Sequence, residues 1–175
     1  MEPEKNRGKL KIFFSYAPGK RAVHAMLRAG CLAAEQGADA VAAVQAADDA
    51  QAAEYLGKLE CLPPGRVTDE GRTGPEFDLD GAVRRRPLLL LLDSLAHING
   101  DGARHYRRYQ DVEELLNAGI NVYTTLTVMN IESLSDQVTA ITGRRIPERI
   151  PDHVFDYASQ VEMVDAEPET LTGGL

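Results

Sequence analysis

A short polar stretch at residues 15–23, Ser-Tyr-Ala-Pro-Gly-Lys-Arg-Ala-Val, stands where a phosphate-binding loop would be expected. It follows the apolar run at 9–14 and leads into a segment of helical periodicity at 21–38. A loop of this kind uses glycines to bring backbone N–H groups to phosphate, a lysine to contact the β- and γ-phosphates, and a Ser or Thr hydroxyl to bind Mg²⁺. The glycine-lysine-threonine ending is absent. The stretch is therefore either a modified phosphate site or the remnant of one.

A second polar group, Asp93 and Ser94, directly follows the apolar run at 88–92. In proteins that transfer phosphoryl groups, an aspartate at the end of a second strand helps to hold Mg²⁺. Asp93 is thus a weak candidate metal ligand. We favour a structural role, in which Asp93 caps the next turn or bonds to the loop at 15–23, because Val23 offers no hydroxyl to complete a metal site. Ser15 could take that place.

The histidines and cysteines add no catalytic or metal-binding pattern. His97 and His105 flank a glycine-containing loop, but no cluster of Cys or Glu supplies the further ligands that a metal site needs. Cys31 and Cys61 lack metal-type spacing and imply no disulfide framework. A reducing, cytosolic setting is the simplest inference.

Apolar runs and helical periodicities alternate along the chain, an order typical of a parallel sheet covered by helices on both faces. The sequence predicts one domain over residues 1–175, a three-layer α/β/α sandwich with a mainly parallel sheet of about five strands. Ligands of such sheets bind at the carboxyl ends of the strands. Strands are predicted at 9–14, 39–46, 88–92, 120–128 and 160–166. Helices are predicted at 21–38, 48–59, 78–87, 110–119, 130–143 and 152–159, and 63–76 is predicted to be a loop with a little edge structure.

Some side chains are expected to serve the helices themselves. Asp48 or Asp49 should cap the helix at 48–59, and His24 is expected to be a packing or surface residue rather than a catalytic base. Gly37 and Gly119 suit the ends of helices, and the helix at 78–87 must stop before its proline.

Composition and charge exclude several classes of protein. The formal net charge of −8 disfavours nucleic acid as a partner, because duplex binding requires a basic surface. The local basic clusters at 84–86 and 104–108 are expected to be solvated faces. No apolar stretch is long enough to cross a membrane, and the polar opening of the chain is not a secretory signal, so direct membrane insertion of this segment is not expected.

Several long motifs are informative together: "IFFSYAPG", "EFDLD", "LLDSLAH", "RRYQDVEELLNAGINVYTTLTV", "IESLSDQVTAITG", "IPERIPD" and "VEMVDAEPE". With them the chain resembles the N-terminal cytoplasmic domain of the KdpD-type osmosensitive potassium sensor histidine kinases. The resemblance covers nearly the whole chain and implies a regulatory domain of the P-loop NTPase type, which precedes a second cytoplasmic domain, membrane helices and a kinase core.

The departures from the family pattern gather at the expected nucleotide pocket. In the family the loop ends Pro-Gly-Val-Gly-Lys-Thr, so Pro18 and Gly19 are kept while Arg21, Ala22 and Val23 replace glycine, lysine and threonine. Arg21 adds a side chain where the backbone should meet phosphate, Ala22 removes the charge, and Val23 loses the hydroxyl. Near the other strands, "AADDA" replaces the family's Glu-Thr-His-Gly-Arg at 46–50, and Ser94 replaces an acidic residue.

The resemblance and the departures together predict a non-catalytic regulatory or sensory input domain with a degenerate nucleotide site. No catalytic residue and no cofactor is predicted for this domain, whereas the parent protein that it resembles is a histidine kinase of the inner or plasma membrane. Expected partners are the remaining domains of that kinase or a signalling partner. The tail at 167–175 looks frayed or truncated.

Two alternatives stay open. Lys20 could stand in for the missing lysine in a residual ATP and Mg²⁺ site, because the start of a helix offers free N–H groups and the positive end of its dipole. The altered pocket could instead take another anion or a small molecule.

Overall fold

The computed structural model describes most of the first two thirds of the chain and shorter parts of the rest. The described residues are 7–16, 20–44, 49–69, 72–99, 105, 107–127, 130–131, 140–141, 143, 150–151 and 158–164, with the backbone alone for 65–69 and 72–76. Of the predicted site, Pro18 and Gly19 lie outside this range, as do most of the predicted helices at 130–143 and 152–159.

The core of the fold is a sheet of six parallel strands in the order β3-β2-β6-β7-β1-β8. The prediction of an α/β fold with a mainly parallel sheet is therefore confirmed, and the short edge strand β3 is the addition to the five expected strands. The strands are β1 (Leu10–Ser15), β2 (Ala40–Ala42), β3 (Glu60–Cys61), β6 (Leu89–Leu91), β7 (Asn121–Thr127) and β8 (Gln160–Met163).

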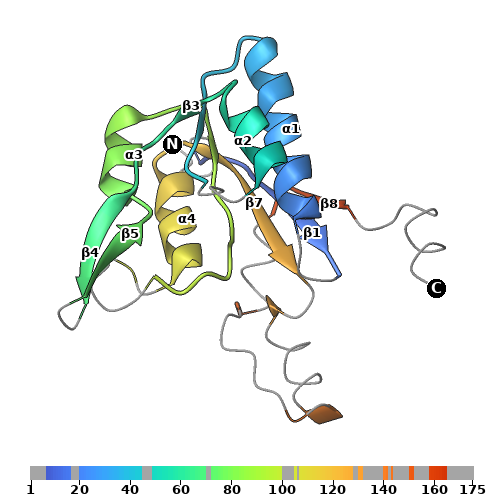
Figure 1. Cartoon of the computed structure of the whole chain (residues 1–175), viewed down its shortest axis with the longest axis vertical. Helices are drawn as coiled ribbons and strands as arrows, with labels where there is room; N and C mark the ends of the chain where they lie inside the picture. Colours follow the sequence, from blue (N-terminus) through green and yellow to red (C-terminus); the bar gives the residue numbers. More distant parts are fainter. Residues whose placement is uncertain are drawn as a thin grey trace.

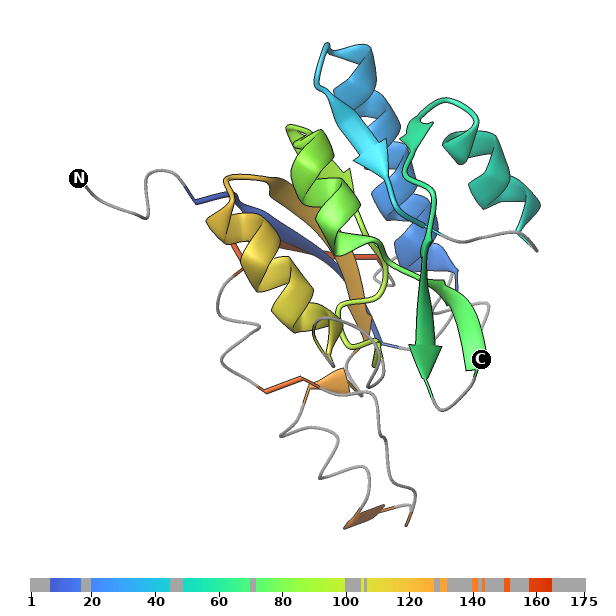
Figure 2. The same cartoon turned by 90° about the vertical axis from the view of Figure 1, so that its left-hand side faces the viewer.

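Helices cover both faces of this sheet (Figure 1). Helices α1 (Arg21–Glu35) and α2 (Ala50–Leu56) lie on one face, and α3 (Leu79–Arg85) and α4 (Arg108–Asn117) on the other, as the rotated view in Figure 2 also shows. Each face has its own hydrophobic cluster. In the first, Met26 and Leu27 of α1 pack on Phe13 of β1; in the second, Val112 and Leu115 of α4 pack on other sheet residues.

The run of leucines at 88–92 shows why a fully apolar sequence forms a strand here. Leu89 and Leu91 face α1 and α2, whereas Leu90 and Leu92 face α3 and α4. Because successive side chains of a strand point to opposite faces, a strand buried on both sides needs an apolar residue at every position. The packing is close, since a Cβ on Gly30 of α1 would lie 2.3 Å from Leu91 Cδ2.

The helix ends follow the predicted signals. Oδ1 of Asp49 accepts the N–H of Ala52 at 3.1 Å and so caps α2, as predicted. Gly37 and Gly119 follow α1 and α4 with φ of 98° and 87°, a conformation that glycine adopts without strain. Helix α3 ends before Pro87, as expected.

One segment differs from its prediction. Residues 63–76, expected to be mainly loop, contain an antiparallel hairpin of β4 (Gly65–Asp69) and β5 (Arg72–Glu76) on the side of the molecule where α3 lies (Figure 1). The glycines and Pro75 concealed it, because both residue types are depleted in strands and signal turns.

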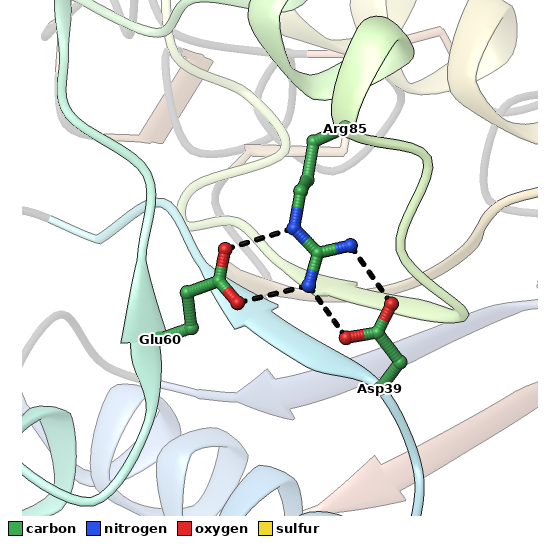
Figure 3. A network of polar contacts seen from close by, with 3 residues as sticks. All are labelled: Asp39, Glu60 and Arg85. Carbon is green, nitrogen blue, oxygen red and sulfur yellow. Dashed lines mark hydrogen bonds and ion pairs between the residues drawn. The ribbon is translucent and has the colours of Figure 1, made fainter.

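Arg85 fastens the edge of the sheet at the amino ends of β2 and β3. Its guanidinium donates two hydrogen bonds to Asp39, at 2.7 and 2.9 Å, and two to Glu60, both at 2.8 Å (Figure 3). Hydrogen bonds from Arg85 hold the pKa of Asp39 and of Glu60 below their ordinary values. This clamp connects α3 to β3, a strand of two exposed residues at the edge of the sheet.

Candidate functional site at the carboxyl edge of the sheet

At the carboxyl ends of the neighbouring parallel strands β2 and β6, the connections to the next helices leave toward opposite faces of the sheet. The chain leaves β2 toward α2 on one face, and it leaves the neighbouring strand β6 toward α4 on the other face. Connections that part in this way leave a crevice at the ends of the strands, where ligands of open α/β sheets bind.

A cavity of about 280 Å³ lies in this crevice. Its walls come from the ends of β2, β3 and β6 and from the starts of α3 and α4, so five elements that are distant in sequence meet around it. The lining residues are Ala43, Val44, Leu62, Pro63, Pro64, Phe77, Asp78, Asp93, Ser94, His97 and Arg108.

Asp93, predicted from its place after the buried strand, lines this cavity. Burial raises the pKa of its carboxyl, and the neighbouring charge of Arg108, its own backbone N–H and the charge of His97 oppose that rise in part. Ser94 lies beside it in the lining. A partly buried carboxyl of raised pKa in a cleft is a feature of binding and catalytic sites, and ion-pair networks also produce it.

Arg108 belongs to the basic cluster at 104–108, which was expected to be a solvated face, and that expectation is wrong for this residue because it is buried beside the cavity. It is 8% exposed, its backbone N–H donates to the carbonyl of His97 at 3.0 Å, and its Nη1 donates to the carbonyl oxygen of Asp93. A signal was present in the sequence: Arg108 precedes Val112 and Leu115 by four and seven positions, which places an arginine on the buried stripe of α4.

A short polar network holds these groups in place. Nδ2 of Asn99 donates to the backbone carbonyl of His105 at 3.0 Å and to Oδ2 of Asp111 at 2.7 Å. Gln110 accepts the N–H of Arg107 at 3.0 Å, which caps the start of α4. These hydrogen bonds connect the segment that follows β6 to the start of α4. They fix His97 and Arg108 at the rim of the cavity.

The predicted phosphate site lies at the start of α1. Lys20 and Arg21 are exposed, Ala22 is 5% exposed and packs in the cluster beneath α1, and Val23 is partly buried against the same cluster. The two positions at which a phosphate loop carries its lysine and its hydroxyl are thus occupied by alanine and valine, which contact the core.

His24, one turn into α1, contacts the cap of α2. Its Nε2 lies 2.7 Å from Oδ2 of Asp49, so an N–H there donates to the carboxylate. The pKa of Asp49 is lowered, first by the N–H of Ala52 and then by His24. The pair joins α1 to α2, which accords with the structural role expected for both residues.

Asp93 follows a strand that is not adjacent to β1, the strand that leads toward α1. Strand β7 lies between β1 and β6, and at the usual strand spacing the latter two are about 10 Å apart. Among the described residues, none of 20–23 lines the cavity; Arg21 instead lines a shallow groove between α1 and β8. Within that part of the chain, no three His, Cys, Asp or Glu side chains are grouped to hold a metal ion, and no helix is long and apolar enough to span a membrane.

Comparison with known proteins gives a consistent result. Residues 6–175 match the family described as "KdpD: Osmosensitive K+ channel His kinase sensor domain". The chain is 46% identical over 171 residues to the sensor protein KdpD of Clostridium acetobutylicum and 45% identical over 167 residues to that of Escherichia coli. These alignments cover 97% and 95% of this chain but 19% of each relative, so the chain spans about a fifth of their length.

Proposed function

This chain belongs to the family of KdpD osmosensitive K⁺ channel histidine kinase sensor domains, and we propose that it acts as a regulatory input domain with a degenerate nucleotide site. In this proposal it is the cytoplasmic part of a two-component sensor kinase for potassium or osmotic signalling. It works through contacts with the rest of that kinase or with a signalling partner, and the parent protein lies in the inner or plasma membrane.

The observation that carries the proposal is the environment of Ala22. A functional phosphate loop presents a lysine near this point, whereas Ala22 is 5% exposed and packs with Met26 and Leu27. Val23 has no hydroxyl to bind Mg²⁺. Without the lysine and the metal ligand, the charges that stabilise phosphoryl transfer are missing, which argues against hydrolysis by this domain.

Restoring the family loop tests this proposal. We expect the variant Arg21→Gly/Ala22→Lys/Val23→Thr to bind ATP in the presence of Mg²⁺ when titrated calorimetrically, and the natural chain to give no binding heat under the same conditions. The double variant Arg21→Gly/Val23→Thr, which lacks the lysine, is the matched control. Equal behaviour of all three proteins would contradict the proposal that these three positions inactivated the site.

A second candidate function rests on Lys20 and Arg21. Both are exposed at the start of a 15-residue helix, where free N–H groups and the helix dipole favour an anion. A residual ATP site of this kind would require Lys20, so binding by the natural chain that disappears in Lys20→Ala would support it. Binding of another anion with the same dependence on Lys20, but none of ATP, would support a different ligand.

A further inference from the structure

We propose that the cavity between the carboxyl ends of β2 and β6 binds a small, uncharged heteroaromatic ring of the nucleobase or nucleoside class. Among the described residues of the stretch at 15–23, none lines this cavity, and the proposal does not depend on nucleotide binding by that stretch. The proposal follows from the charge, the walls and the size of the cavity.

The charges around the cavity disfavour a simple ion. Asp78 and Asp93 supply carboxyl groups, Arg108 supplies one guanidinium, and His97 supplies an imidazole. A phosphate or carboxylate ligand would meet two acids, and a small cation would meet the guanidinium, which already binds the carbonyl of Asp93. An uncharged ligand that both donates and accepts hydrogen bonds avoids the cost of burying an unpaired charge.

The polar groups are suited to the edge of such a ring. Oδ1 of Asp78 accepts the N–H of Gly81 at 3.0 Å, which fixes a carboxylate that lines the cavity and is of a type that accepts from ring N–H or amino groups. Ser94 brings a hydroxyl that can donate or accept, and the carboxyl of Asp93 lies beside it in the lining. The edges of nucleobases carry alternating donors and acceptors of this kind.

The remaining walls are apolar and suit the faces of the ring. Phe77 offers an aromatic surface, and every nucleobase has a π-face that can stack on one. The other apolar walls are Ala43, Val44, Leu62, Pro63 and Pro64. At about 280 Å³, the cavity is at the lower limit of ligand pockets, which run from about 300 to 1,000 Å³, so it suits a single ring system better than a whole nucleoside triphosphate.

Ligand-observed NMR titration with adenosine, guanosine, cytidine and uridine, each without phosphate, tests the proposal. We expect at least one nucleoside to bind saturably below millimolar concentration without Mg²⁺. Asp93→Asn should weaken its affinity about tenfold, because the amide replaces one carboxyl oxygen by an NH₂ group that cannot accept a hydrogen bond from the ring. Val44→Phe, which places a larger side chain in the cavity, should abolish binding.

Two control variants distinguish binding in this cavity from binding elsewhere on the molecule. Glu54→Gln, at an exposed position of α2, should leave nucleoside affinity unchanged, and so should Lys20→Ala at the phosphate loop. Circular dichroism confirms the fold of each variant, and Ser94→Ala replaces Asp93→Asn if the latter does not fold. The proposal is overturned if no nucleoside saturates at millimolar concentration, if binding survives Val44→Phe, or if it requires Lys20. Silence toward ATP in the calorimetric test leaves it intact.

Discussion

The packing of Ala22 makes a quantitative prediction about the start of α1. Replacing Ala22 by lysine in the natural chain enlarges a side chain that is 5% exposed and lies among Met26, Leu27 and Phe13. Overpacking of a core position costs about 1–3 kcal/mol. For a domain of this size, each kcal/mol lowers the melting temperature by about 2–4 °C, so we expect a fall of roughly 2–12 °C in thermal denaturation followed by circular dichroism.

A second lysine variant on the same helix provides the control. Leu32 is 52% exposed, and Leu32→Lys should leave the melting temperature close to that of the natural chain, because exposed substitutions usually change stability by less than about 0.5 kcal/mol. If Ala22→Lys melts at the same temperature as Leu32→Lys, position 22 tolerates a lysine without cost. That result would refute the inference that this position has become part of the core.

Two further predictions concern the scaffold that carries the site. Gly8→Ala should lower the melting temperature, because a Cβ there would lie 2.0 Å from the carbonyl oxygen of Ile120, whereas Gly57→Ala should be tolerated, because its Cβ would lie 3.5 Å from the nearest atoms. Equal melting temperatures for the two variants would contradict this. Arg85→Met should remove a stabilisation that depends on pH. The pKa values of Asp39 and Glu60 are lower in the folded state than in the unfolded state, because Arg85 donates hydrogen bonds to both carboxylates. The clamp therefore stabilises the fold fully above the unfolded pKa values, about 4, and this stabilisation disappears as the pH falls through the lower folded pKa values. Urea denaturation should therefore separate Arg85→Met from the natural chain at pH 7 and bring the two together in acid; a constant difference would show that Arg85 acts through packing.

Much of the fold was predictable because single residues carry strong local signals. The leucines at 88–92 indicated a strand buried on both faces, Asp49 indicated a helix start, and Gly37 and Gly119 indicated helix ends. The structure confirms each of these, except that Leu88 lies before β6 and is 54% exposed. Such signals depend on nearest neighbours along the chain, which a sequence shows directly.

The order of the strands and the position of the cavity could not be obtained in that way. The sequence placed Asp93 at the carboxyl edge but did not show that β7 separates β6 from β1. Nor did it indicate that Phe77 and Arg108, from the starts of two helices, would lie around one cavity with Asp93. These relations arise from packing between distant segments, as does the hairpin at 65–76, whose glycines and proline concealed its pairing.

The central claim is that the nucleotide site of this domain is degenerate, and the most direct test is calorimetric titration of the natural chain with ATP, with and without Mg²⁺. We expect no binding heat in either condition. Micromolar binding that requires Mg²⁺ and is lost in Lys20→Ala would contradict the claim, and would show that the stretch at 15–23 is a working phosphate loop with a displaced lysine.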